Sequence, residues 1–227
     1  RGLMLPQLVF DLTAPPALGR EDFFASPANE LAVRALARPG DWPQGKMLLA
    51  GPKGSGKTHL ARIWAADHAA QVIRARSIPA GPTPPGAVLV EDVESVAGDS
   101  AAETALFHLH NAVLSSGSPL LMTGTGQPRD WPVTLPDLAS RLQATAIAML
   151  APPDDALLAA VIVKLFADRQ IAVPPALVPW LVARMERSFT AAHDIVAALD
   201  ARALALGRPV TRALAAEVLD IGAADGT

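Results

Sequence analysis

The sequence GPKGSGKTHLA, residues 51–61, has the composition and spacing of a loop that wraps nucleotide phosphates. In the pattern Gly51-x4-Gly56-Lys57-Thr58, the glycines let backbone N–H groups point at phosphate oxygens, Lys57 supplies a positive charge, and the hydroxyl of Thr58 can bind Mg²⁺. We therefore predict a site for ADP or ATP with Mg²⁺. The nucleotide-binding residues predicted here are Gly51, Pro52, Gly54, Ser55, Gly56, Lys57, Thr58 and His59.

Two acidic residues, Glu91 and Asp92, follow the apolar run AVLV. Nucleotide hydrolases usually place an Asp after such a run, where it helps to hold Mg²⁺. Glu91 is one methylene longer and would crowd a site built for Asp. Asp92 stands where many ATPases place a Glu that polarises water, and it would fall short of that water. We predict Glu91 as a Mg²⁺ ligand beside Thr58 and Asp92 as a weak catalytic base; the alternative is two acids that end a strand by accident.

Two further residues are candidates for the chemistry of a phosphate group. Thr125 follows an apolar run, at the edge where parallel sheets bind ligands, and its hydroxyl is predicted to sense a γ-phosphate; a plain turn is the alternative. Arg141 lies in LPDLASRL, where a lone Arg is usually a solvated charge or part of a local ion pair.

The elements that must position these residues alternate along the chain. Short buried strands are predicted at 47–51, 71–75, 87–94, 119–125 and 146–150. Between the strands we predict one helix that starts at the phosphate loop and two more at 101–117 and 135–142. An earlier helix is predicted to begin near Ser26, which would be its N-cap. This alternation predicts an α/β fold with a five-stranded parallel sheet. Beyond 152–155 only helical patterns remain, at 155–169, 174–185, 190–206 and 211–220, so we predict a separate small helical domain.

The composition excludes several classes of protein. The formal net charge is −3 with no dense Lys/Arg cluster, which argues against direct binding of duplex DNA. The chain has no Cys, which excludes disulfides and thiolate metal sites and fits a cytoplasmic protein. No apolar run reaches the roughly 18 residues of a membrane span.

The segment QLVFDL, residues 7–12, precedes the pair Pro15-Pro16. It reads either as an amphipathic first strand or as a linear peptide that places Gln in a polar pocket and apolar side chains in a groove of a partner protein. In the second interpretation the partner-binding residues are Gln7, Leu8, Phe10 and Leu12.

Five segments, taken in chain order, resemble the Hda family. They are QLVFDL, FFASPANELAV, WPQGKMLLAGPKGSGKTHLA, VLVEDVESVAG and LLMTGTGQPRDWPVTLPDLASRL. These proteins are regulatory inactivators of the bacterial replication initiator DnaA and relatives of its AAA+ domain. The resemblance covers about residues 5–220. It implies that residues around Gln7 bind the DNA-loaded sliding clamp, that Phe24 and Asn29 line the adenine pocket, and that Arg141 is an arginine finger acting in trans on the ATP held by DnaA.

The resemblance also implies the domain organisation and the partners. We expect an extended clamp-binding tail at 1–14, an AAA+ nucleotide-binding domain at 15–152, a helical lid at 153–221 and a disordered tail at 222–227. The partners implied are the clamp, DnaA and, through the clamp alone, DNA; a homodimer is also possible, and no membrane is involved. Glu91, and Thr190 where such lids present an Arg, depart from the pattern and predict weak intrinsic hydrolysis, although Arg187 could substitute for that Arg.

Two other functions remain open from the residues. One is a true ATPase, such as a loader of the replicative helicase, which would require turnover by the isolated chain. The other is a small-molecule kinase, against which stands the absence of an Arg-rich substrate lid after the phosphate loop.

Overall fold

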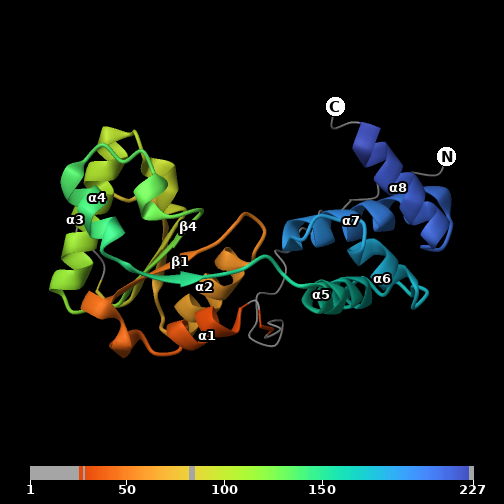
Figure 1. The fold of residues 1–227 in the computed structure, drawn as a ribbon, viewed down its shortest axis with the longest axis horizontal. Coiled ribbons are helices and arrows are strands. Elements are labelled where there is room, and N and C mark those ends of the chain that lie inside the picture. The colour runs from red at the N-terminus through yellow and green to blue at the C-terminus, as the bar shows by residue number, and fades with distance from the viewer. Residues whose placement is uncertain (1–25, 28, 82–84, 225–227) are drawn as a thin grey trace, which may run out of the picture.

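The structure, a computed structural model, describes residues 26–27, 29–81 and 85–224. It has an α/β part and a helical part, joined by the connection that follows the last strand (Figure 1). Phe24 and the predicted partner-binding residues Gln7, Leu8, Phe10 and Leu12 lie outside the described residues.

Five parallel strands form one sheet with the order β2-β3-β4-β1-β5, which confirms the predicted fold class. The three central strands are buried throughout, which explains why they read as continuous apolar runs. Because β1 lies between β4 and β5, the segment after β1 emerges between the carboxyl ends of these two strands. The strands are β1 Lys46–Ala50, β2 Gln71–Arg74, β3 Val88–Glu91, β4 Leu120–Gly124 and β5 Ala146–Met149.

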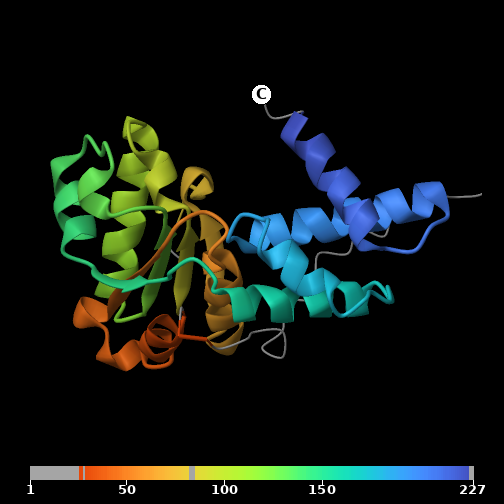
Figure 2. The ribbon, with the colours of Figure 1, turned by 45° about the vertical axis from the view of Figure 1, so that its right-hand side comes forward.

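Helices cover both faces of the sheet, as Figures 1 and 2 show. Alternate residues of β1 enter opposite cores: Leu48 packs with α3 and α4, whereas Leu49 packs with α1 and α2. The helices of this part are α1 Glu30–Leu36, α2 Lys57–Asp67, α3 Ser100–Ser115 and α4 Pro136–Gln143. Short 3₁₀ segments occupy Pro39–Asp41, Pro43–Gly45, Ala75–Ser77, Val93–Val96 and Pro128–Asp130.

The helical part has a core of its own, built from buried side chains of α5 to α8. Its helices are α5 Asp155–Asp168, α6 Leu177–Val182, α7 Phe189–Leu206 and α8 Arg212–Ala224. Asp154 caps α5 as expected, because its Oδ1 accepts a hydrogen bond from the Leu157 N–H at 2.8 Å. Ser188 caps α7 in the same way through the Ala191 N–H at 3.0 Å.

Several predicted element boundaries differ from the structure. The strand predicted at 87–94 ends at Glu91, because Asp92 adopts a left-handed conformation and Val93–Val96 form a 3₁₀ segment. Helix α1 begins at Glu30, and Ser26 is not its N-cap: the Ser26 carbonyl accepts the N–H groups of Asn29 and Glu30, which makes a turn ahead of the helix. At the other end α8 continues to Ala224, so residues 222–224, predicted as part of a disordered tail, are helical. Among the helices of the described residues, none is both long and apolar enough to cross a membrane.

A buried carboxylate fixes the segment that leads into α4. Glu103 on α3 is fully buried, and its two oxygens accept hydrogen bonds from the N–H groups of Gly98, Thr134 and Leu135 and from the Thr134 hydroxyl, at 2.7–3.1 Å. Burial alone would raise the pKa of Glu103, but these bonds outweigh it and lower the pKa below its ordinary value. The carboxylate therefore sets where α4 begins.

Replacing Glu103 with alanine should leave three backbone N–H groups without an acceptor. We expect Glu103→Ala to lower the free energy of unfolding by about 3 kcal/mol, the cost of stranded buried donors. Urea denaturation followed by circular dichroism measures this. The control is Glu186→Ala, which removes an exposed carboxylate; equal stability of the two variants would contradict the role given to Glu103.

Candidate functional site

The glycine loop lies where the sequence predicted it, between the carboxyl end of β1 and the first residue of α2. Lys57 is buried, and its Nζ donates hydrogen bonds to the carbonyls of Gly51 and Pro52, both at 2.8 Å. Burial lowers the pKa of Lys57, while the negative charges of Glu94 and Asp92 oppose that change. The ammonium group is thus held inside the loop, close to the place where phosphate oxygens would bind.

The start of α7 packs directly on this loop. The Phe189 N–H donates to the Gly54 carbonyl at 2.8 Å, and a Cβ on Gly54 would lie 2.5 Å from the Ser188 Cβ. Gly54 also has a φ of +71°, and Gly56, at φ +91°, lies against the Phe189 ring, so both positions require glycine. The N-termini of α2 and α7 therefore meet at one loop, and helix N-termini favour bound anions.

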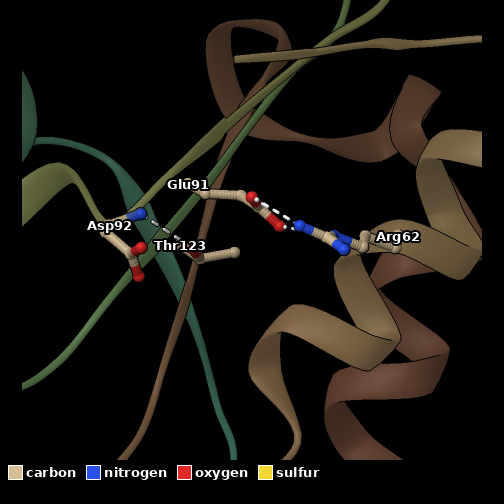
Figure 3. Close-up of polar contacts among 4 residues, drawn as sticks. All are labelled: Arg62, Glu91, Asp92 and Thr123. Carbon is tan, nitrogen blue, oxygen red and sulfur yellow. Dashed lines mark hydrogen bonds and ion pairs between the residues drawn. The ribbon is translucent and has the colours of Figure 1, made fainter. Parts of the chain in front are cut away.

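The carboxylate of Glu91 points at α2 and forms a two-point ion pair with Arg62 (Figure 3). Arg62 Nε lies 2.9 Å from Glu91 Oε1, and Arg62 Nη2 lies 3.1 Å from Glu91 Oε2. The Glu91 side chain is 4% exposed and that of Arg62 is 39% exposed. The hydrogen bond to Glu91 raises the pKa of Arg62, which burial alone would lower.

This pairing bears on the predicted Mg²⁺ site. In phosphate-loop proteins the ion is held by the loop hydroxyl and a carboxylate at the end of the partner strand, with waters and phosphates completing its shell. Thr58 is exposed and meets the first requirement. Glu91 does not fit the second, because a guanidinium engages both of its oxygens. The structure therefore gives the predicted metal ligand an arginine partner.

Asp92 and Glu94 are the acids whose charges act on Lys57. Asp92 has a φ of +59°, and its backbone N–H donates to the Thr123 hydroxyl at 3.1 Å (Figure 3). This left-handed residue follows β3 and leads into the 3₁₀ segment that carries Glu94. One carboxylate oxygen of Glu94 is buried without a hydrogen-bond partner. The acids whose charges reach Lys57 are thus Asp92, whose role as a weak base stays a prediction, and Glu94, which sequence reasoning did not single out.

The remaining residues predicted to bind nucleotide lie just beyond β4, ahead of α1, in the phosphate loop and on α2. The buried hydroxyl at the end of β4 belongs to Thr123, whereas Thr125 lies beyond the strand, where its carbonyl accepts the Trp131 indole N–H at 2.7 Å. Asn29 is buried just ahead of α1, and its Oδ1 accepts the Ser26 N–H at 2.9 Å. Ser55 is buried in the loop, and His59 is half-buried on α2. The roles predicted for these residues stay predictions.

In the helical part Thr190, not Arg187, lies next to the phosphate loop. The Thr190 hydroxyl oxygen would be 3.3 Å from a Cβ on Gly54. Arg187 pairs instead with Asp155 at 3.0 Å, and its side chain is 64% exposed. In this arrangement Arg187 does not take the place of a lid arginine.

Arg141 lies at the opposite edge of the sheet from the phosphate loop. It is exposed in the last turn of α4, with its guanidinium 5.2 Å from the centre of the Phe107 ring. Its backbone carbonyl accepts a hydrogen bond from Lys46 Nζ at 3.0 Å, and Lys46 is the first residue of β1. The loop follows the last residue of β1, and a five-residue strand spans about 13 Å. The Arg141 backbone and the chain's own phosphate loop thus lie at opposite ends of one strand.

A buried polar group supports the helix end that carries Arg141. Lys46 is 2% exposed, and its Nζ also lies 3.4 Å from His110 Nε2. Burial, followed by the charge of Arg141, lowers the pKa of Lys46; burial and the charge of Lys46 lower the pKa of His110 to about 4. His110 is therefore neutral at pH 7, and Lys46 Nζ is the group that donates a hydrogen bond to the last turn of α4.

No family model matches this chain. Among solved structures it is similar to domain III of the replication initiation protein DnaA from Thermotoga maritima, with a TM-score of 0.75 and 20% identity, covering 90% of this chain and 96% of that one. It is also similar to AMPPCP-bound DnaA from Aquifex aeolicus, with a TM-score of 0.66, 13% identity and coverage of 82% of this chain and 65% of that one. The chain is similar as well to the Thermotoga maritima RuvB Holliday junction branch migration motor, with a TM-score of 0.60 and 17% identity. That comparison covers 84% of this chain and 66% of the RuvB chain.

These similarities establish the fold: the chain has the fold of DnaA domain III. At such low identity they do not establish an activity. The chain also spans 65% of the length of the AMPPCP-bound DnaA chain.

Proposed function

We propose that this protein is a nucleotide-bound regulator that docks on the DNA-loaded sliding clamp and delivers Arg141 to the ATP held by DnaA, thereby limiting the initiation of replication. The observation that carries the proposal is the position of Arg141, exposed at the edge of the sheet remote from its own phosphate loop. An arginine so placed is suited to a phosphate in another molecule. A guanidinium supplied in trans can raise the rate of hydrolysis by about 10³–10⁵.

The chain's own site supports a regulatory use of nucleotide rather than rapid turnover. Glu91 is held by Arg62, and the residue that the lid places at the loop is Thr190. The first feature removes a carboxylate, and the second an arginine, that a self-sufficient hydrolase uses. Bound nucleotide would instead hold the α/β part and α7 together across the loop, in the way that a ligand stabilises the state it binds.

Likeness of fold supports DnaA as the partner. In this proposal the chain, whose fold is similar to that of DnaA domain III, lies beside that domain and presents α4 to its nucleotide site. The DnaA of Aquifex aeolicus was solved with AMPPCP, a nucleotide analogue, which supports nucleotide binding by the shared fold. A homodimer arranged in the same way is the competing assembly.

The clamp is the partner proposed for the segment around Gln7. We expect Gln7→Ala combined with Leu8→Ala to weaken clamp binding by at least about tenfold, because the pair removes the polar and apolar anchors of a short peptide. Surface plasmon resonance with immobilised clamp measures this. Leu18→Ala, in the same N-terminal segment but outside residues 7–12, serves as the control. Unchanged affinity of the double variant would place clamp binding elsewhere.

The proposal as a whole is tested by measuring hydrolysis of DnaA-bound ATP in the presence of this protein. Acceleration that depends on Arg141 supports it. Steady ATP turnover by the isolated chain, lost on Lys57→Ala, would favour a self-sufficient AAA+ ATPase such as a helicase loader.

A further inference from the structure

Arg62 and Thr58 share one face of α2, because they are four residues apart in a helix. Thr58 begins that face at the phosphate loop, and Arg62 lies one turn further along. The Glu91 carboxylate, at the end of β3, reaches this face and binds Arg62 through both oxygens. A fixed cation thus engages the carboxylate that sequence reasoning assigned to a metal ion.

We propose that Arg62 replaces the metal ion in this nucleotide site, so that the chain binds a nucleoside diphosphate without Mg²⁺. The inference rests on the nucleotide-binding half of the proposed function. It assigns a role in ligand binding to a residue that no motif of the phosphate loop includes.

The charges around the loop explain why a cation is needed there. Glu91, Asp92 and Glu94 all lie on β3 or directly after it, and a diphosphate adds further negative charge. Lys57 and Lys53 are the cations of the loop, and the N-termini of α2 and α7 add partial positive charge. Without Arg62, an unpaired Glu91 would repel the diphosphate in a largely buried environment, where such repulsion is poorly screened. Metal-bound sites offset this repulsion with Mg²⁺, whereas here the guanidinium offsets it permanently.

The geometry of the pair favours this role. Two parallel N–H···O bonds fix the carboxylate in one orientation, which a Lys could not do, and the arginine stays charged at every physiological pH. Glu rather than Asp at position 91 gives the reach that this pairing uses. The length that makes Glu91 a poor substitute for a metal-binding Asp is thus the length that lets it meet Arg62.

The experiment is titration of the full chain with fluorescent ADP, once with excess Mg²⁺ and once with excess EDTA. For the unaltered protein we expect the two dissociation constants to agree within about twofold. For Arg62→Ala we expect binding in EDTA to weaken by about tenfold relative to binding in Mg²⁺, because the freed Glu91 repels the diphosphate unless the metal is present. Adding Glu91→Ala to that variant removes the freed charge and should return the ratio towards one.

Arg34→Ala is the matched control, since Arg34 also pairs with a Glu, on α1; its ratio should equal that of the unaltered protein. Arg62→Lys keeps a charge and should give an intermediate ratio. If Arg62→Ala does not fold, as judged by circular dichroism, Arg62→Lys and the double variant decide the question.

A tenfold or greater loss of affinity in EDTA for the unaltered protein would overturn the inference, as would the same ratio in Arg62→Ala and the unaltered protein. Either result leaves the action of Arg141 on DnaA standing. Failure of Arg141 in the hydrolysis assay leaves the Mg²⁺ result equally intact.

Discussion

Replacing Arg141 with alanine is expected to abolish the stimulation of ATP hydrolysis by DnaA and to leave clamp binding unchanged. The guanidinium is exposed and lies over the Phe107 ring, so its removal costs little packing. A finger supplied in trans is worth about 10³–10⁵ in rate, so even partial loss should be large. The measurement is the rate of release of labelled phosphate from ATP prebound to DnaA, with clamp loaded on DNA.

Arg129→Ala is the matched control for this variant. Arg129 is also exposed and precedes α4, with Asp130 as its ion-pair partner at 3.7 Å. It should stimulate DnaA as well as the unaltered protein does. Normal stimulation by Arg141→Ala would show that another residue supplies the charge, and equal losses in both variants would indicate a general loss of the surface around α4.

The second large effect is expected from Lys57→Ala, which should weaken the binding of ADP by about a hundredfold. Lys57 is the one loop cation whose ammonium is enclosed by the loop carbonyls, and charge-assisted bonds to phosphate are among the strongest polar contacts in proteins. The loss of a buried cation near Asp92 and Glu94 adds electrostatic repulsion of the ligand. Isothermal titration calorimetry with ADP measures the change.

Lys53→Ala tests whether the effect belongs to this ammonium group or to the charge of the loop in general. Lys53 lies in the same loop but is exposed, so its removal should weaken binding only severalfold. If both variants lost affinity equally, or if Lys57→Ala bound ADP normally, the phosphate loop would not hold the nucleotide as argued. Because the Lys57 side chain also bonds to the loop carbonyls, thermal unfolding of each free protein must be compared.

The sheet could be predicted because its central strands are buried on both faces. The apolar runs predicted as strands at 47–51, 87–94 and 119–125 overlap β1, β3 and β4. The helix ends were less certain from sequence. Ser26 and Asn29 are both good cap residues three positions apart, and only the turn at Ser26 decides between them.

The arrangement within the site depends on contacts that no local pattern contains. Arg62 meets Glu91 across 29 positions in sequence, and on α2 it looks like any solvent-facing arginine. Glu94 comes near Lys57 because Asp92 adopts a left-handed conformation, which residue types alone do not require. A useful signal was present nonetheless: Thr58 and Arg62 stand four apart on a helix that faces the acidic end of β3.

The central claim is tested most directly by the hydrolysis of DnaA-bound ATP with this protein added, with and without the clamp loaded on DNA. The account predicts rapid hydrolysis with the loaded clamp, little without it, and none above background for Arg141→Ala. Absence of acceleration with and without the clamp would contradict it. Binding to the replicative helicase would then be the next assay.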